Sequence, residues 1–237
     1  FEWLHSQFMI KCGLQYRRYD FIHRLLSKLD EHDINPCVLK GESIAILYDT
    51  SIARISGDTD ILIEPQKIDL CLKIMKDMGF DIGEKGYDSH HIECEHPICG
   101  LVEIHTMMYG KRTEDVCFNH AIKYNEEYLS IETEDGAIFK TLGTTDNFMF
   151  LFLHFIKHFL SSGVGIRQLE DVLIYTEKNY DKINWERVNT SFKDLGFEKI
   201  FKCVIAIGKK YFSFPEKLFA SYVISDSLIE RVFDDMM

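Results

Sequence analysis

The chain has 237 residues, with 27 Lys and Arg against 38 Asp and Glu, so its formal net charge is −11 at pH 7. Hydrophobic residues make up 46% of the chain and only 14 Gly and 4 Pro occur. This excludes a disordered or collagen-like chain and leaves enough apolar mass for one large domain or two small ones. The acidic balance disfavours nucleic acid and anionic membranes as partners, because the field of the whole protein repels phosphates.

The cysteines and the apolar stretches indicate the cellular compartment that we expect for the protein. Seven cysteines cannot all pair in disulfides, which favours a reducing environment, and we expect a cytoplasmic protein. The longest apolar stretch, 148–156, is interrupted by His154 and is too short to cross a bilayer. We therefore expect no membrane-spanning segment.

The first half of the chain alternates helix and strand signals. Ile22, Leu25, Leu26 and Leu29 recur at helical spacing, which predicts a helix ending near Asp30. Short apolar runs and turn residues then predict further elements in chain order. These are a strand at 37–39, a helix at 43–48, a strand at 59–64, a helix at 68–78, and strands at 89–94 and 101–107. The order is typical of a small α/β unit with a mixed sheet.

After Gly136 the pattern becomes helical. Apolar spacing predicts helices at 147–160, 166–175, 185–195, 197–207 and 225–233. The expected fold is α+β: a small mixed β-sheet core with flanking helices, followed by a C-terminal helical domain. We expect an N-terminal helical segment at 1–32, the α/β core at 33–140 and the helical domain at 141–237, with the boundary between the halves near 130–143.

Acidic residues on two predicted strands form the most informative pattern. Asp58 and Asp60 are two residues apart, so both carboxylates project from the same face of their strand. On the later strand, Glu103 and His105 share the face opposite the apolar neighbours of Glu103. If the two strands are neighbours, the three acids form one cluster. Clustered carboxylates repel each other unless a cation lies between them, and this donor set suits Mg²⁺.

A glycine turn precedes the acids. Gly41 ends a predicted strand and opens a predicted helix, and backbone N–H groups at such a junction favour an anion. A phosphate-binding turn next to an acidic cluster is what phosphoryl or nucleotidyl transfer requires, since metal ions stabilise the entering and leaving oxygens.

These motifs resemble the nucleotidyltransferase superfamily, which has a DNA polymerase β-like fold and a hydrophobic–Gly–(Gly/Ser) turn before an Asp-x-(Asp/Glu) strand. More narrowly, residues 33–178 are similar to a bacterial family of poorly characterised nucleotidyltransferases. The similarity lies in Leu39-Lys40-Gly41, Leu47-Tyr48, Arg54, Asp58-Thr59-Asp60-Ile61-Leu62, Val102-Glu103-Ile104-His105, His154 and Arg167-x-x-x-Asp171. Two residues depart from the superfamily pattern: Glu42 stands in place of Gly or Ser, and Thr59 in place of an apolar residue.

The resemblance implies roles for individual residues. Asp58 and Asp60 would bind the catalytic and the nucleotide-associated Mg²⁺ (or Mn²⁺), and Glu103 would complete the catalytic metal site and help to deprotonate an acceptor hydroxyl. The β- and γ-phosphates of an NTP would be held by the turn and by a guanidinium, that is, by Lys40, Gly41, Ser43 and Arg54. The candidate cleft residues are His91, His105, His154, Arg167 and Asp171.

Several of these residues also have plainer interpretations. Lys40 and Arg54 could be ordinary surface charges, and His105 could make a hydrogen bond within the sheet. His154 and His158 are spaced as a zinc pair, but no third ligand follows, so structural histidines are favoured. Arg167 and Asp171 are four apart and fit an intrahelical ion pair.

The stretch 90–99 holds three His and two Cys and could bind zinc, although the spacing of Cys94 and Cys99 fits a hairpin with incidental thiols better. The sequence thus predicts a metal-dependent transfer of NMP from an NTP to a hydroxyl of a small molecule or protein, with release of pyrophosphate. The alternatives are a non-catalytic nucleotide-binding or partner-binding module with the same fold, and a zinc protein built on residues 90–99.

Overall fold

A computed structural model describes residues 2–84, 91–110, 113–122, 128–133, 136–161, 163, 165–215 and 224–236. The chain divides into two compact units. The first consists of Phe1–His120 with Tyr124–Gly143, and the second of Ala121–Lys123 with Thr144–Met237. The N-terminal helix therefore belongs to the same unit as the sheet.

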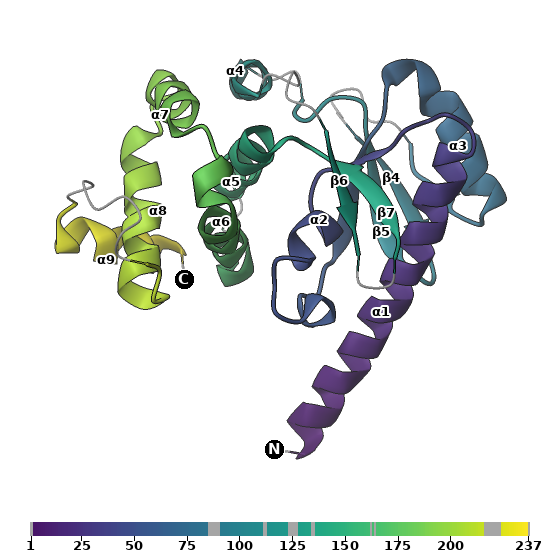
Figure 1. Ribbon diagram of the computed structural model, residues 1–237, viewed down its shortest axis with the longest axis horizontal. Coiled ribbons are helices and arrows are strands. Elements are labelled where there is room, and N and C mark those ends of the chain that lie inside the picture. The colour runs from purple at the N-terminus through teal and green to yellow at the C-terminus, as the bar shows by residue number, and fades with distance from the viewer. Residues whose placement is uncertain are drawn as a thin grey trace. The chain divides into compact units, whose positions relative to one another are not determined.

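The first unit combines helices with one sheet (Figure 1). Its helices are α1 (Glu2–Asp30), α2 (Glu42–Ala45), α3 (Ile68–Asp77) and α4 (Thr113–Ala121), with 3₁₀ turns at Ser51–Ala53 and Pro65–Lys67. Its strands are β1 (Cys37–Val38), β2 (Asp58–Leu62), β3 (Asp81–Ile82), β4 (His91–His96), β5 (Gly100–His105), β6 (Leu129–Glu132) and β7 (Ile138–Thr141).

The strands form a mixed sheet in the order β3-β4-β5-β2-β1-β7-β6. The pairs β2–β5 and β1–β7 are parallel, whereas the other neighbours are antiparallel. In the central pair, Asp60 lies opposite Glu103. The expected α+β fold, with a small mixed sheet, flanking helices and a helical second half, is confirmed.

The core lies between the sheet and the helices α1 and α3, which lie on the same side of it in Figure 1. Alternate residues of β2 and β5, among them Ile61, Val102 and Ile104, are fully buried in this core with Leu25 of α1 and Met75 of α3. Because side chains alternate along a strand, Asp58, Asp60, Glu103 and His105 lie on the other face. The helices thus stabilise one face and leave the other to polar groups.

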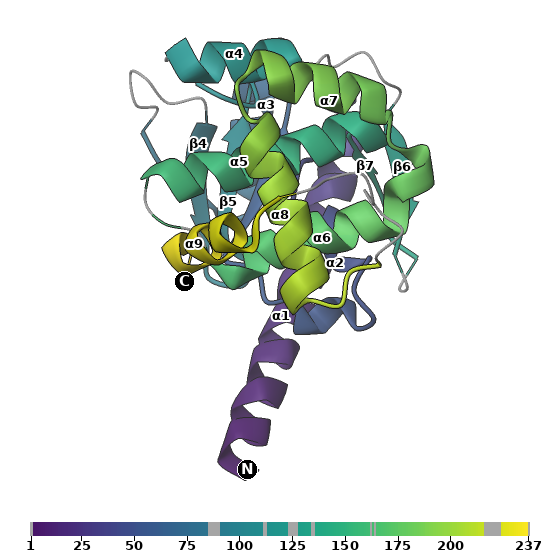
Figure 2. The same cartoon turned by 90° about the vertical axis from the view of Figure 1, so that its left-hand side faces the viewer.

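Helix α1 lies within the expected N-terminal helical segment at 1–32. Its buried residues begin at Cys12, and its first turns extend beyond the sheet (Figure 2). Trp3, Phe8 and Ile10 are each about half or more exposed there. These turns are not packed on the core, and the spacing of Ile22, Leu25, Leu26 and Leu29 identified the buried part of the helix.

The sequence analysis missed the strands near the junction between the units. Residues 129–132 of β6 pair antiparallel with residues 138–141 of β7, and β7 pairs in parallel with β1. The strands β6 and β7 are four residues each, and β6 is mostly exposed. Strands as short as these give little apolar alternation for a prediction to detect. The sequence analysis also missed the two-residue β3 and the helix α4, because neither segment has a clear apolar pattern.

The second unit is helical, as expected, with α5 (Thr144–Ser161), α6 (Ile166–Asn179), α7 (Trp185–Asp194), α8 (Glu198–Tyr211) and α9 (Asp226–Met236), and a 3₁₀ turn at Tyr180–Lys182. Its core is aromatic, with Phe152 packed between Phe192 and Phe201. Arg187 forms an ion pair with the buried carboxylate of Asp146. Within the described part of the chain, no helix has the length and apolar content needed to span a bilayer.

Candidate active site

The acids of β2 are fixed in place from the opposite face of the sheet. Thr59, between Asp58 and Asp60, points toward α1, where its hydroxyl accepts a hydrogen bond of 2.9 Å from Nη2 of Arg18. The same nitrogen donates to the Leu101 carbonyl at 3.1 Å, so Arg18 joins β2 to β5. Arg18 is 7% exposed. Sequence analysis missed it, although its place on the apolar stripe of α1, four residues before Ile22, was a usable signal.

Lys40 lies between the two acids of β2. Its Nζ is 2.9 Å from Oδ2 of Asp58 and 3.2 Å from Oδ2 of Asp60. Burial alone would lower the pKa of Lys40, but Asp60 and Asp58 outweigh it and raise that pKa. The ammonium therefore stays charged and partly neutralises the pair. Its expected contact with phosphate remains a prediction.

Glu103 and His105 bring the neighbouring strand into the same cluster. The β2–β5 register sets Asp60 beside Glu103. The Nε2 atom of His105 lies 3.0 Å from Oδ1 of Asp60 and 3.3 Å from Oε2 of Glu103. Burial disfavours the imidazolium, but hydrogen bonds to these two carboxylates raise the pKa of His105 to about 9. His105 is thus a charged bridge between the two acids at neutral pH.

His91 extends the cluster to β4. It lies opposite His105 in the antiparallel register, and the two rings have centroids 5.3 Å apart. The Nδ1 atom of His91 is 3.8 Å from Oε2 of Glu103. One ligand atom from each of His91, Glu103 and His105 lies within 4.8 Å of the others. Lys40, Asp58, Asp60, His105, Glu103 and His91 therefore form a continuous row, which we call the charged row, across β2, β5 and β4, with Lys40 shortly after β1.

The turn before α2 is built on glycine. Gly41 has φ 82° and ψ −105°, a backbone conformation that strains residues with a Cβ. Arg54, 6% exposed, donates from Nη1 to the Gly41 carbonyl at 3.1 Å. Arg54 thus holds the turn, and Ser43 is buried behind it. Phosphate binding by Gly41, Ser43 and Arg54 stays a prediction.

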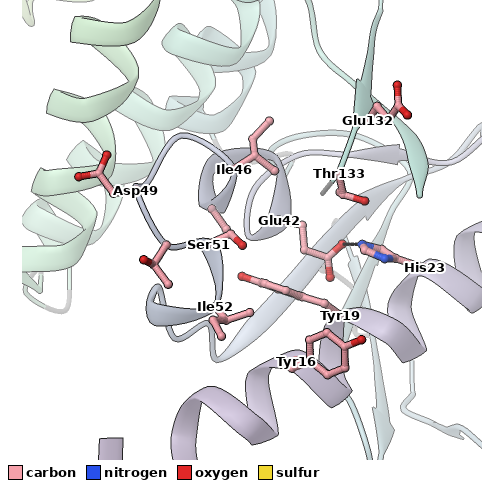
Figure 3. A pocket seen from close by; sticks show the side chains of 12 residues that line it. Tyr16, Tyr19, His23, Glu42, Ile46, Asp49, Ser51, Ile52, Glu132 and Thr133 are labelled. Carbon is pink, nitrogen blue, oxygen red and sulfur yellow. Dashed lines mark ion pairs between the residues drawn. The ribbon is translucent and has the colours of Figure 1, made fainter. Parts of the chain in front are cut away.

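Glu42, the residue that departs from the superfamily pattern, points away from the charged row. Its Oε2 lies 3.4 Å from Nε2 of His23 on α1, and the carboxylate is 2% exposed. Figure 3 shows this pair at a cavity of about 540 Å³ that Tyr16 and Tyr19 also line. Because α1 covers the opposite face of the sheet, Glu42 adds no carboxylate to the cluster of Asp58 and Asp60.

The two cysteines of the alternative zinc site at 90–99 join no candidate metal cluster among the described residues, which exclude His90. The one candidate metal cluster that the described residues form contains neither Cys94 nor Cys99. Burial raises the pKa of the Cys94 thiol to about 12 and that of Cys99 to about 11, so neither is a thiolate at neutral pH. His96 stacks on Phe21 with ring centroids 4.1 Å apart.

The remaining candidate residues lie in the second unit. The rings of His154 and His158 on α5 have centroids 4.5 Å apart, and no metal cluster within the described part of the chain includes them. Arg167 and the buried Asp171 lie on α6. The expected place of His154, Arg167 and Asp171 in the cleft remains a prediction.

Comparisons with known proteins agree with the motifs. Residues 15–213 match a family described as "Uncharacterised nucleotidyltransferase", while no curated protein matches in sequence. The solution structure of the antibiotic-resistance factor ANT(2″)-Ia is similar, at 12% identity, TM-score 0.50, and coverage of 86% of this chain and 98% of that one. A crystal structure of ANT(2″)-Ia with adenylyl-2″-tobramycin has 12% identity, TM-score 0.50, and coverage of 74% and 95%.

The lincosamide antibiotic adenylyltransferase LnuA, bound to lincomycin, matches with 14% identity, TM-score 0.47, and coverage of 67% of this chain and 94% of that one. The two ANT(2″)-Ia structures support the fold alone at this level of identity. The family match covers most of the chain, including the glycine turn and the charged row. The protein is therefore a member of this uncharacterised nucleotidyltransferase family.

Proposed function

We propose that the protein transfers an NMP group from an NTP to a hydroxyl of a small molecule or, as a second choice, of a protein side chain. The acceptor oxygen attacks the α-phosphorus, the bond from that phosphorus to the β-phosphate oxygen breaks, and pyrophosphate and the hydroxyl proton leave. The observation that carries this proposal is the alignment of Asp58, Asp60 and Glu103 on one face of adjacent strands. Family membership supports the class of reaction.

The charged row suits a divalent cation. Its carboxylates are hard oxygen ligands, and the ammonium of Lys40 between Asp58 and Asp60 shows that the two acids accommodate a positive charge. Asp58, Asp60 and Glu103 would hold Mg²⁺ or Mn²⁺. When bound, the metal would stabilise negative charge on the α-phosphate and on the departing pyrophosphate.

The chain's own residues would position the substrates. Lys40 lies one residue before the glycine turn and pairs with both acids of β2, so its ammonium is placed to pair with phosphate when a nucleotide arrives. Gly41 supplies the backbone conformation of the turn, and Arg54 anchors its carbonyl. Glu103, 18% exposed at its side chain, is accessible enough to accept the acceptor proton, while the buried His105 orients it.

We base the choice of acceptor on the net charge of the chain and on its similarity to solved structures. The net charge of −11 disfavours nucleic acid. One structure of ANT(2″)-Ia contains adenylyl-2″-tobramycin, which supports a small-molecule alcohol here. The free state of all seven cysteines supports our placement of the protein in the cytoplasm.

One observation favours a second candidate, a non-catalytic module that keeps the fold. Lys40 already neutralises Asp58 and Asp60, and such internal pairing would also serve a protein that binds partners without turnover. The pairing is compatible with catalysis only if nucleotide binding draws Lys40 toward phosphate.

Labelling separates the two candidates. The protein is incubated with each α-³²P-labelled NTP, Mg²⁺ or Mn²⁺ and a small-molecule cell extract, in parallel with Asp58→Asn and, as a matched surface control, Asp20→Asn. Asp20 is exposed and paired only with its helix neighbour Arg24 in the described contacts. We expect label in a new species with wild type and Asp20→Asn, and none with Asp58→Asn. NTP binding without label transfer under any of these conditions would favour the module.

A further inference from the structure

The two ends of the charged row differ in their ligand chemistry. At one end, Asp58 and Asp60 offer only carboxylate oxygens around Lys40. At the other end, Glu103 lies between two imidazoles, those of His91 and His105. We propose that His91, Glu103 and His105 form a second site, which shares Glu103 with the proposed Mg²⁺ site, for a first-row transition-metal dication, with Zn²⁺ and Co²⁺ as representatives.

The spacing of the donors fits such an ion. Two ligands bound at about 2.1 Å in a tetrahedral zinc site lie about 3.4 Å apart. Here Oε2 of Glu103 is 3.3 Å from Nε2 of His105 and 3.8 Å from Nδ1 of His91. All three ligand atoms lie within 4.8 Å of one another. A shift of His91, the more exposed imidazole, would complete the geometry.

The backbone holds the donors rigidly. Glu103 and His105 are alternate residues of β5, and His91 lies opposite His105 on β4 in an unbroken antiparallel register. His105 is 3% exposed, while His91 and Glu103 are 22% and 18% exposed at their side chains. The strands therefore place the donors in advance and leave the site reachable from solvent. A metal ion that binds Nε2 of His105 displaces the proton that this nitrogen shares with Asp60 and Glu103.

The donor set selects the class of ion. Mg²⁺ prefers oxygen ligands and keeps several waters, so two imidazoles are poor ligands for it. Imidazole nitrogen suits zinc and the later first-row metals, whose affinities follow the Irving–Williams order. The His–Glu–His end should hold such an ion even when Mg²⁺ is in excess.

Three protein ligands leave a position open, as in catalytic zinc sites. This role rests on the proposed function. A metal ion with an open position would polarise an acceptor hydroxyl beside Glu103, while the nucleotide binds at the end of the charged row that holds Asp58. Metal binding itself does not depend on that function, and it can be measured without a nucleotide.

The test uses Co²⁺, whose visible absorption reports its ligands. EDTA-treated protein is titrated with Co²⁺ in excess Mg²⁺ and without nucleotide, and the bound ion is then displaced with Zn²⁺. We expect one saturable site with the spectrum of nitrogen and oxygen ligands and without thiolate charge-transfer bands. His91→Asn and Glu103→Gln should each weaken Co²⁺ binding by about tenfold or more. The exposed His32→Asn should match wild type, and melting curves verify that each variant is folded.

Three results would overturn the proposal: no Co²⁺ uptake by wild type in excess Mg²⁺, thiolate bands in the spectrum, or equal affinity in folded His91→Asn. Thermal stabilisation of wild type by Mg²⁺ with an NTP is measured in parallel. If Co²⁺ binds as expected but no NTP does, the metal site stands and the proposed function fails. If NTP binds but Co²⁺ does not, the proposed function stands and the metal site fails.

Discussion

The two faces of the same strands in the first unit have opposite characters. On β2 and β5, Ile61 and Ile104 point into the core under α1, whereas the alternate residues Asp60 and Glu103 belong to the charged row. Because successive side chains of a strand point to opposite faces, residues that stabilise the fold alternate along β2 and β5 with residues of the charged row. The comparison teaches that a substitution on the core face should reduce folding stability, whereas one on the charged face should mainly change ligand binding.

The largest loss of stability should come from the core face. Ile104→Ala removes a fully buried side chain and should lower the free energy of unfolding by about 2–5 kcal/mol through lost burial and the cavity left behind. Urea denaturation measures this change. Leu70→Ala, at a residue 39% exposed, is the control and should change little. A loss below about 1 kcal/mol for Ile104→Ala would contradict this assignment of the core.

The next effect concerns Arg18, a charged group that enters the core face. Arg18→Met keeps a long side chain but removes hydrogen bonds to Thr59, Gly57 and Leu101. We expect a loss of about 2–3 kcal/mol, because a buried charged donor supports three acceptors. Arg24→Met, on the same helix but 60% exposed, should cost less than about 0.5 kcal/mol. Equal losses in the two variants would show that Arg18 does not join the strands.

The charged face should affect how the free energy of unfolding depends on pH. Hydrogen bonds to Asp60 and Glu103 raise the pKa of His105 from 6.5 to about 9 against the effect of burial. Protonated His105 therefore stabilises the folded protein fully below about pH 6.5, and this contribution is lost as the pH rises through about 9. In EDTA, we expect wild type to lose on the order of 1–3 kcal/mol across this window.

The control for this pH dependence is His105→Asn, which lacks the titrating group. Its stability should vary less between pH 6.5 and 9 than that of wild type, as followed by urea denaturation at several pH values. Identical slopes in the two proteins would mean that His105 is not a charged bridge between the two acids.

The sequence predicted the part of this arrangement that depends on local pattern. Period-two alternation placed Asp58 and Asp60 on one face, and Glu103 with His105 on another strand, and the fold joins those strands as neighbours. The sequence could not predict which side chains meet across the sheet. The Lys40 bridge and the approach of His91 to Glu103 follow from strand order and register, which are long-range properties.

The prediction also failed where local signals are weak. The strands β6 and β7 have four residues each, and β6 is mostly exposed. Glu42 shows a different limit. It departs from the superfamily pattern at the glycine turn, and its pairing with His23 on α1 turns it to the other side of the sheet. Tertiary contacts decided its direction, and no local rule describes them.

The smallest expected effect on stability comes from Asp58→Asn. Asp58 is 31% exposed at its side chain and pairs with Lys40, which retains Asp60 as a partner. The free energy of unfolding should therefore change by less than about 1 kcal/mol. Urea denaturation in EDTA measures it, and a loss as large as that of Ile104→Ala would mean that Asp58 has a structural role.

Binding of an NTP with Mg²⁺ to wild type and to Asp58→Asn, measured by isothermal titration calorimetry with and without EDTA, tests the central claim most directly. The account predicts binding by wild type that EDTA removes, and a loss of at least about tenfold in affinity for the folded Asp58→Asn protein, because one carboxylate for the nucleotide-associated metal is gone. Wild type that binds no NTP, or Asp58→Asn that binds it equally well, would contradict the assignment of the charged row to nucleotidyl transfer.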